Sequence, residues 1–404
     1  MEKGYCFLPE EIGGSPNLVR EEISLPAAVI FAEQLEENLM WMQEFCDRQG
    51  VLFAPHAKTT MTPYIFTRQR KIGAWGLTFA TPVQIYNAYR SGARNLIMAN
   101  QLVGRANMKI IAAMQEDRDV NYFCVVDSID NVRDLADFFA EHNQTLNVMI
   151  ELGVPGGRCG CRTDKQVDRL VAEIAKHASI RLTGIEFYEG VVHGDDPEIL
   201  VRQFIERAVS TLKRLMVEDA FDDDQVIATG AGSAWYDIVA DVFSKADLPL
   251  NVLPVLRPGC YVTHDCGIYQ DAQDKVLLRS PSLCEIPGEL TNCLEVWAIV
   301  CSVPEDGKVV VNLGKRDVAF DAGYPGVVRH FRKGRAIASN FADWQATEIM
   351  DQHLMIDVPL TTDIKPGDML AFSQSHPCLT MDKWRQVHLV DNHFNVTETV
   401  STVF

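Results

Sequence analysis

A lysine and a histidine at the end of an apolar segment are the first residues whose types and spacing could do chemistry. His56 and Lys58 follow the apolar run from Val51 to Pro55. Because side chains alternate along a strand, residues two apart point to the same side. Lysine is rarely buried without a partner, and a buried neutral amine can form a Schiff base with a carbonyl compound. A lysine that reaches solvent along its apolar stem, or one that pairs with a carboxylate, is the alternative.

Segment 229–233, TGAGS, has the composition of a phosphate-binding turn. Gly230 and Gly232 would let the backbone approach a phosphate closely, and Thr229 and Ser233 carry hydroxyl donors. The helical pattern of residues 233–243 follows directly, and a helix N-terminus offers free N–H groups to an anion. An ordinary strand-to-helix turn is the alternative. Tyr261 could add a phenol to the same phosphate, unless it is only a half-buried tyrosine.

A third candidate is the pair His376 and Cys378 in segment 371–384. Pro377 disfavours helical geometry at His376, so we expect an extended segment in which both side chains point the same way. An imidazole and a thiolate suit zinc, although an unrelated histidine and a buried cysteine would show the same spacing. Two further pairs share this spacing and are left out of the predicted metal site: His264 with Cys266, and Cys159 with Cys161.

The elements that must position these residues alternate between apolar runs and amphipathic helical stretches, of which 196–216 is the longest. Runs that are apolar nearly throughout are typical of parallel strands buried on both faces. Strand–helix alternation repeated eight times predicts a (β/α)8 TIM-like barrel, in which the chemistry lies at the carboxyl ends of the strands. An open doubly wound sheet would more naturally carry a glycine-rich fingerprint after its first strand. The eight runs are 51–57, 74–80, 95–100, 121–128, 146–153, 182–190, 225–232 and 251–259.

After about residue 268 the pattern changes to β-rich segments punctuated by Pro, Gly and Asp, without regular helical spacers. This predicts a mainly antiparallel β domain after the α/β barrel. We expect the barrel to span residues 26–268, and the β domain to span 269–404 together with 1–25. The candidate metal pair lies in the β domain, whereas Lys58 and TGAGS lie in the barrel.

Composition excludes several classes of protein. The 404 residues carry a net charge of −18, which makes nucleic acid an unfavourable partner because phosphate contacts need basic side chains. No apolar run approaches the roughly 20 residues of a membrane span. We see no secretory signal at the N-terminus. The 11 scattered cysteines then predict reduced thiols and a cytoplasmic location.

Taken in order, several segments resemble one family along essentially the whole chain. PHAKTT (55–60) resembles the cofactor-lysine segment of fold-type III pyridoxal-phosphate enzymes, which share an alanine-racemase-like barrel. More narrowly, it resembles the D-serine dehydratase and D-threonine aldolase family. Further segments similar to that family are ELGVPGGRCG (151–160), GIEFYEG (184–190), TGAGS (229–233) and RPGCYV (257–262).

The resemblance implies that pyridoxal 5′-phosphate forms a Schiff base with Lys58. It matches Arg158 and Tyr188 to the family's arginine and tyrosine, with Arg158 either near the cofactor ring or pairing with a carboxylate. It also implies a homodimer. The cofactor-binding residues that we expect are Lys58, His56, Arg158, Tyr188, Thr229, Gly230, Gly232, Ser233 and Tyr261.

The metal pair points toward one reaction of the family. His376 and Cys378 resemble the zinc ligands of eukaryotic-type D-serine dehydratases, whereas D-threonine aldolases carry His-x-Asp here. We therefore expect β-elimination from a D-β-hydroxy amino acid, giving a 2-oxo acid and ammonia. Lys58 would remove the α-proton and zinc would stabilise the departing hydroxyl. Retro-aldol cleavage to glycine and an aldehyde, racemisation, and a cofactor carrier without activity are the alternatives.

Overall fold

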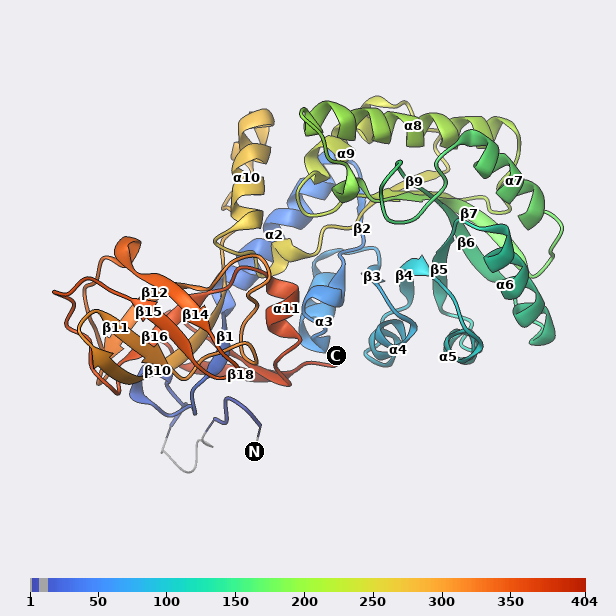
Figure 1. Cartoon of the computed structure of the whole chain (residues 1–404). Coiled ribbons are helices and arrows are strands. Elements are labelled where there is room, and N and C mark those ends of the chain that lie inside the picture. Colours follow the sequence, from blue (N-terminus) through green and yellow to red (C-terminus); the bar gives the residue numbers. More distant parts are fainter. Residues whose placement is uncertain (1, 7–13) are drawn as a thin grey trace.

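The computed structural model describes residues 2–6 and 14–404, in which eight parallel strands form one sheet (Figure 1). The strand order is β2-β9-β8-β7-β6-β5-β4-β3. A bridge between His56 and Thr78, and a hydrogen bond of 2.8 Å from Trp75 N to Phe53 O, join β2 to β3 and close the barrel. The strands are β2 (Leu52–Phe53), β3 (Leu77–Phe79), β4 (Asn95–Gln101), β5 (Asn121–Val126), β6 (Leu146–Leu152), β7 (Ile180–Phe187), β8 (Val226–Gly230) and β9 (Val252–Leu256).

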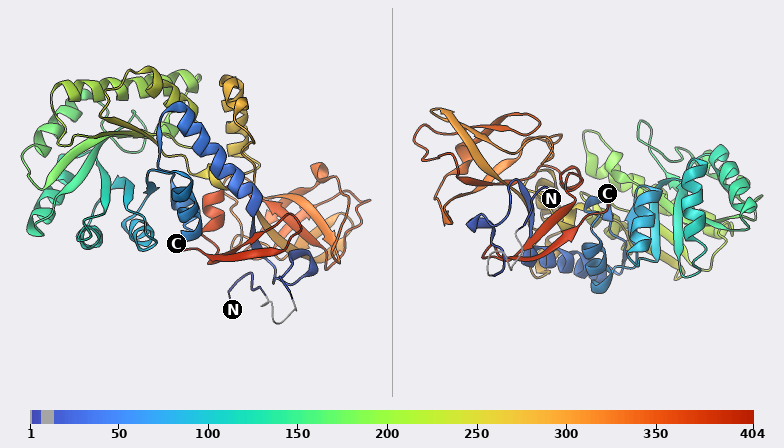
Figure 2. Two further views of the ribbon diagram at one scale, coloured as in Figure 1. Left: turned by 180° about the vertical axis from the view of Figure 1, so that it is seen from behind. Right: turned by 90° about the horizontal axis from the view of Figure 1, so that it is seen from below.

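Each predicted apolar run overlaps one of these strands, so the barrel prediction is confirmed. The helices between the strands cover the outside of the barrel (Figure 2). Their ends carry side-chain caps where the sequence offers them: Ser128 accepts from Asn131 N at α6, and Thr163 forms a capping box with Gln166 at α7. The helices are α2 (Ala32–Gln49), α3 (Pro63–Ile72), α4 (Pro82–Arg90), α5 (Arg105–Met114), α6 (Ile129–Glu141), α7 (Asp164–Ile174), α8 (Pro197–Val217) and α9 (Tyr236–Lys245).

The second sheet is mainly antiparallel, as the sequence predicts. Its one parallel pairing in the described residues joins β1 (Ala27–Phe31) to β17, and β1 also pairs antiparallel with β10. The predicted barrel start at residue 26 therefore falls too early, because β1 belongs to the second sheet and the barrel unit begins with α2. The other strands are β10 (Leu294–Glu305), β11 (Lys308–Val311), β12 (Gly326–Arg332), β13 (Arg335–Ala336), β14 (Gln345–Ile349), β15 (Leu354–Asp357), β16 (Met369–Ser373), β17 (Gln386–Val390) and β18 (Val396–Ser401).

One of the remaining helical segments, α11 (Pro377–Met381), brings the second unit against the barrel. Helix α11 lies beside α3 in both Figures 1 and 2, and it contacts the turn η2 (Ala57–Thr59). The C-terminal segment runs along the same side, where Val403 N donates to Met61 O at 2.7 Å. The other segments are α10 (Ile268–Arg279) and the 3-10 turns η1 (Leu18–Arg20), η3 (Glu189–Val191), η4 (Cys260–Val262), η5 (Pro281–Glu285) and η6 (Phe341–Asp343).

No helix within residues 2–6 and 14–404 is both long enough and apolar enough to cross a membrane. None of the cysteines in this part of the chain forms a disulfide.

Candidate active site

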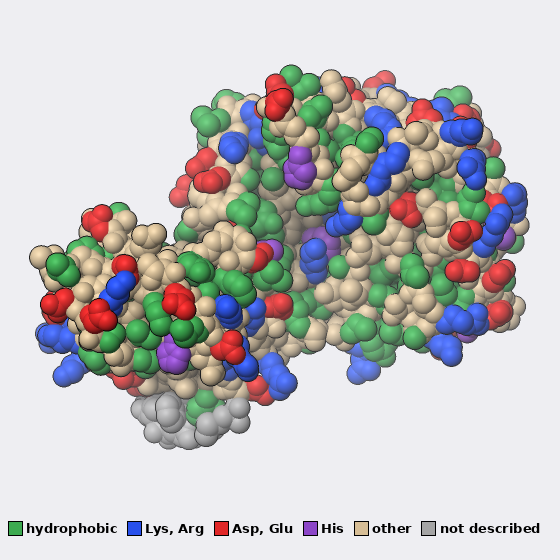
Figure 3. Space-filling model, in the orientation of Figure 1, with side chains coloured by type: hydrophobic (Ala, Val, Ile, Leu, Met, Phe, Trp, Pro, Cys, Tyr) green, Lys and Arg blue, Asp and Glu red, His purple; other side chains and the backbone are tan. Residues whose placement is uncertain are grey.

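A cavity of about 310 Å³ lies at the carboxyl ends of the barrel strands, where α11 of the second unit reaches the barrel. In Figure 3 a hollow between the two units shows basic and histidine side chains. Its volume is in the range of small-molecule sites, about 300–1,000 Å³. The predicted residues that line it are His56, Lys58, Arg158, Tyr188, Gly232, Ser233, His376 and Cys378.

Lys58 lies in η2, the turn directly after β2, rather than on the strand itself. It forms no ion pair with any residue in the described part of the chain, which argues against a lysine held only by a carboxylate. His56 lines the same cavity, and burial together with the cations Lys58 and Arg257 holds the pKa of this imidazole well below its usual range. The neighbouring histidine is therefore neutral at physiological pH.

Only part of the predicted phosphate turn reaches the cavity. Gly232 and Ser233 line it, whereas Thr229 and Gly230 belong to β8 and do not. The Thr229 hydroxyl donates to Val255 O at 2.9 Å, because the side chain faces the neighbouring strand β9. At Gly230 a Cβ atom would collide with the Phe187 ring, which packs against Phe204 of α8 and Phe243 of α9, so this glycine serves packing between the barrel strands and the outer helices.

A carboxylate that the sequence analysis missed already binds this turn. Glu189 is fully buried and accepts hydrogen bonds from Gly232 N at 2.6 Å and Ala231 N at 3.2 Å. Ser233 Oγ accepts from Gly259 N at 3.2 Å and from Cys260 N at 3.1 Å. The backbone N–H groups of residues 231 and 232 are therefore committed to Glu189, and Ser233 ties the turn to the segment after β9.

Tyr261, predicted to reach the phosphate, does not line the cavity. Its side chain is buried away from the cavity, where its ring packs against Phe53 with centroids 5.4 Å apart. Gln69 Nε2 donates to its hydroxyl at 3.1 Å, and burial raises its pKa. The turn η4 directs the preceding residue, Cys260, into the cavity instead.

A buried ion pair between Glu186 and Arg257 also lines the cavity and was missed from the sequence. Arg257 additionally donates to Phe187 O at 3.1 Å. Among the described residues Glu186 Oε2, Arg257 Nε and His56 Nδ1 are buried without a hydrogen-bond partner. Buried polar atoms are normally paired, so these atoms indicate a polar ligand in the cavity. The only sequence signal was a glutamate inside the otherwise apolar run 182–187.

A second buried carboxylate lies beside Glu186 in the sheet. Glu151 of β6 is opposite Glu186 of β7, and burial followed by the charge of Glu186 raises the pKa of Glu151 to about 8. Gln101 Nε2 donates to it at 2.6 Å. In the described residues Asp127, Glu151 and Cys159 form a group whose ligand atoms all lie within 4.8 Å of one another. Their side chains are partly satisfied by protein donors, as Asp127 accepts from Gly160 N at 2.8 Å.

His376 and Cys378 both line the cavity. The segment predicted to be extended through both residues is extended only at His376, because a helix follows it. His376 is extended, with φ −153° and ψ 104°, and α11 begins at Pro377. His376 Nδ1 lies 2.8 Å from Asp321 Oδ2, and its hydrogen bonds with Cys378 and Asp321 raise its pKa to about 9. Hydrogen bonds from Cys260 and His376 hold the pKa of Cys378 well below its usual range, which favours a thiolate.

The other two pairs of the same spacing do not reach this cavity. His264 is buried, with Nδ1 3.0 Å from Asp265 O, and Cys266 is exposed. Cys161 is buried, and its thiol contacts Asp127 O at 3.9 Å. Neither pair lines the cavity, which agrees with the prediction that they are not part of the metal site.

The side chains present fit pyridoxal 5′-phosphate. Lys58 supplies the amine that a Schiff base needs, and Arg158 and Arg257 supply positive charge for an anionic ligand. Tyr188 offers an aromatic ring, over which the Arg158 guanidinium lies at 5.1 Å from the centroid. A Cβ atom at Gly232 would lie 2.8 Å from that ring, so only glycine permits this close approach of the turn.

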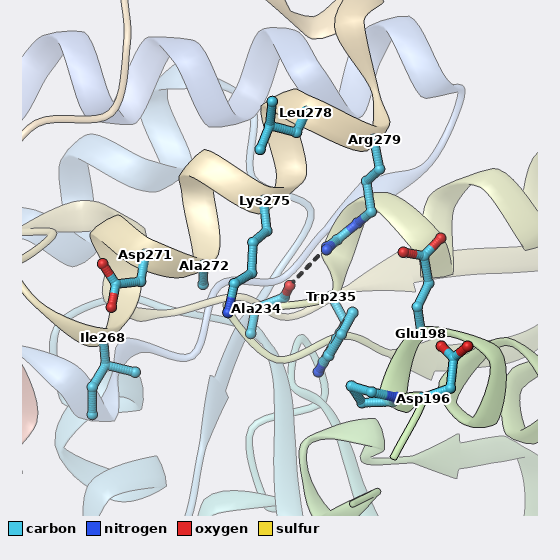
Figure 4. A pocket seen from close by; sticks show the side chains of 11 residues that line it. Asp196, Glu198, Ala234, Trp235, Ile268, Asp271, Ala272, Lys275, Leu278 and Arg279 are labelled. Carbon is cyan, nitrogen blue, oxygen red and sulfur yellow. Dashed lines mark hydrogen bonds between the residues drawn. The ribbon is translucent and has the colours of Figure 1, made fainter. Parts of the chain in front are cut away.

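A second cavity of about 710 Å³ lies outside the barrel, between α10 and the starts of α8 and α9 (Figure 4). Arg279 closes one side by donating to Ala234 O at 3.0 Å, and its guanidinium lies 4.7 Å from the Trp235 ring centroid. Arg279 is also paired with Asp237 at 2.6 Å. The residues that line this cavity include Lys275 but neither a histidine nor a cysteine, so the combination of residues found in the first cavity is not repeated here.

Two family models match the chain. The model described as "Alanine racemase, N-terminal domain" matches residues 32–234, and the one described as "Putative serine dehydratase domain" matches residues 293–390. The first covers 203 of the 404 residues. The chain belongs to the alanine racemase N-terminal domain family. It thus combines the fold-type III pyridoxal-phosphate barrel with a serine-dehydratase-like β domain.

Individual relatives are aldolases and dehydratases, both of which are lyases. D-threonine aldolase of Arthrobacter sp is 24% identical over 329 residues, which cover 80% of each chain. D-threo-3-hydroxyaspartate dehydratase of Delftia sp. (strain HT23) is 29% identical over 181 residues, 44% of this chain and 47% of that protein. The crystal structure of D-threonine aldolase from Filomicrobium marinum superposes with a TM-score of 0.77 at 22% identity, covering 94% of this chain and 95% of that one. The prediction of a lyase agrees with these relatives.

Proposed function

We propose that this protein is a pyridoxal-phosphate- and zinc-dependent lyase that removes the β-hydroxyl of a D-β-hydroxy amino acid such as D-serine. The products would be a 2-oxo acid and ammonia. One observation carries the proposal: Lys58 of the barrel and the pair His376 and Cys378 of the β domain line the same cavity. The lysine would take the α-proton, and a metal on the pair would assist departure of the β-hydroxyl.

The barrel residues would hold the cofactor and move one proton. Lys58 Nζ would bind the cofactor and then take the proton from the α-carbon of the substrate. Bound pyridoxal phosphate would supply an electron sink for the charge that develops there. The neutral imidazole of His56 adds no further positive charge beside Lys58. Glu186 and Arg257 keep unpaired polar atoms that could orient the bound groups.

The β-domain residues would hold the metal. His376 and Cys378 offer nitrogen and sulfur, which favour zinc over the oxygen-preferring magnesium and manganese. Asp321 orients the imidazole from the other side, as carboxylates that hydrogen-bond to metal-bound histidines do. Zinc would act as a Lewis acid on the β-hydroxyl, which is otherwise a poor leaving group. The ligand Cys378 favours elimination over aldol cleavage, because the resembling dehydratases carry His-x-Cys at this position and the aldolases carry His-x-Asp.

Retro-aldol cleavage is the second candidate, and the similarity to D-threonine aldolase over 80% of the chain favours it. The same residues would then bind the β-hydroxyl on the metal, and the Cα–Cβ bond would break. Glycine and an aldehyde would result instead of a 2-oxo acid.

Product identification separates the two reactions. The protein, reconstituted with pyridoxal phosphate and zinc, is assayed with D-serine, D-threonine and D-3-hydroxyaspartate, with the L-isomers as controls. We expect 2-oxo acid and ammonia in equal amounts, and loss of activity on chelation. Glycine as the main product would establish the aldolase, and turnover that survives metal removal would exclude zinc from the reaction.

We also propose that the protein works as a homodimer, as its resemblance to the family implies. Exposed apolar side chains beside the second cavity, Ile199, Ile268 and Leu278, are compatible with a protein contact. Light scattering after size-exclusion chromatography tests this, and a monomer at micromolar concentration would contradict it.

A further inference from the structure

Cys260 and Cys378 come from different domains, yet their sulfur atoms lie 3.8 Å apart. Zinc binds a cysteine sulfur at about 2.3 Å, so two sulfurs on one tetrahedral zinc ion lie about 3.8 Å apart. The separation of these two thiols therefore already equals one edge of a zinc tetrahedron. Cys260 follows β9 in η4, and Cys378 lies in the first turn of α11.

Cys260 is placed for a ligand rather than for packing. It is only 5% exposed, yet it lines the cavity together with Lys58 and the metal pair. Its neighbour Tyr261 points the opposite way, into the barrel wall, so the turn selects the cysteine for the cavity. Thr59 Oγ1 lies 3.4 Å from Cys378 Sγ, which fixes that sulfur beside the lysine turn.

We propose that Cys260 is a third protein ligand of the metal, so that Cys260, Cys378 and His376 form a Cys2His site. This rests on the proposed function, which places a metal at His376 and Cys378. Catalytic zinc sites usually have three protein ligands and keep a fourth position open. Cys260 supplies the ligand that a His-x-Cys pair lacks, and the open position remains for the substrate hydroxyl.

The ion would draw His376 toward Cys260. Without an ion, the imidazole and Cys260 each contact Cys378, and the three ligand atoms do not lie as close together as those of Asp127, Glu151 and Cys159. The His376 side chain is 28% exposed and therefore has room to turn. Once bound, the metal would join the barrel to the β domain, because Cys260 belongs to one and the other two ligands to the other.

Cobalt binding tests the proposal without any turnover. Cobalt(II) is titrated into metal-free, cofactor-free full-length protein, and the near-ultraviolet sulfur-to-cobalt charge-transfer band is recorded. The intensity of this band follows the number of thiolate ligands, so Cys260→Ser should remove about half of it and weaken cobalt binding at least about tenfold. Cys378→Ser should have a similar or larger effect. The matched control is Cys284→Ser, because Cys284 is an exposed cysteine of η5 outside the cavity.

A second measurement needs no variant and guards against misfolding of Cys260→Ser. X-ray absorption at the zinc edge of the zinc-loaded wild-type protein counts sulfur neighbours at about 2.3 Å. Two sulfurs support the proposal, and one sulfur overturns it.

An unchanged cobalt band in Cys260→Ser also overturns it while leaving the pair His376 and Cys378 intact. Absence of any charge-transfer band in the wild type would instead remove the metal from the proposed function. A Cys260–Cys378 disulfide in the purified protein that persists with zinc present would overturn the ligand role of Cys260.

Discussion

Asp321 Oδ2 lies 2.8 Å from His376 Nδ1, so one nitrogen of the imidazole is held by a carboxylate and Nε2 is left for a metal. Both residues are in the β domain, but the histidine lines a cavity whose other walls are barrel strands. The carboxylate also favours the tautomer in which Nδ1 carries the proton.

Asp321→Asn should therefore weaken zinc binding by about 10–100-fold, because the orienting carboxylate is lost while all direct ligands remain. Competition with a chromophoric chelator measures this affinity. Asp351→Asn is the control, since Asp351 is exposed and pairs only with Arg316 among the ion pairs of the described chain. Equal zinc affinities of wild type and Asp321→Asn would show that Asp321 does not orient the ligand.

Lys58→Ala should abolish both the visible absorbance of bound pyridoxal phosphate and the covalent adduct that borohydride traps. The reason is that Lys58 is the lysine lining the cavity, and its amine is not held by an ion pair in the described structure. Mass spectrometry of the reduced protein locates the adduct. Lys71→Ala, which changes an exposed lysine near the end of α3, should retain both signals. An adduct that persists in Lys58→Ala would place the cofactor elsewhere.

Glu151 predicts a pH dependence of stability. Its pKa is about 8 in the folded protein against 4.5 for an ordinary glutamate, so the folded state keeps a proton that the unfolded state has lost between these values. Stability must then fall as pH rises from about 4.5 to about 8, by at most roughly 1.4 kcal/mol per pH unit, and level off above.

Glu151→Gln should remove this loss, because the amide cannot ionise and still accepts from Gln101. The variant should gain stability relative to wild type between pH 5 and pH 8, as measured by urea unfolding of the cofactor-free protein. Glu141→Gln, at an exposed ion pair with Arg105, provides the control. A wild-type stability that rises over this range, with the same rise in Glu151→Gln, would contradict the assignment.

Gly184 is a packing requirement of the barrel. A Cβ atom there would overlap the carbonyl of Ile227 on the neighbouring strand β8, and backbone cannot move aside as a side chain can. Gly184→Ala should destabilise the protein by about 1–3 kcal/mol or more, and should lower its thermal midpoint. Gly14→Ala, where nothing lies within 4 Å of the added atom, should change the midpoint little.

The sequence by itself determined the elements of this protein. Eight apolar runs became eight barrel strands because burial on both faces requires continuous apolar residues, a property local to each run. Lys58 and TGAGS stand at the ends of two of these runs, so the sequence also placed them at the carboxyl ends of strands. The change to punctuated β segments predicted the second sheet, although the contribution of β1 to it was missed, since a five-residue strand gives no sign of its partner.

Only the tertiary structure decided which side chains meet. It turned Tyr261 into the barrel wall and Cys260 into the cavity, because one 3-10 turn sends adjacent residues in opposite directions. It paired Glu186 with Arg257, two residues that are 71 positions apart in the sequence. It brought His376 and Cys378 to Lys58 through the docking of α11 on η2. Such contacts depend on strand register and on the packing of one domain against another, and no local pattern of residues encodes either.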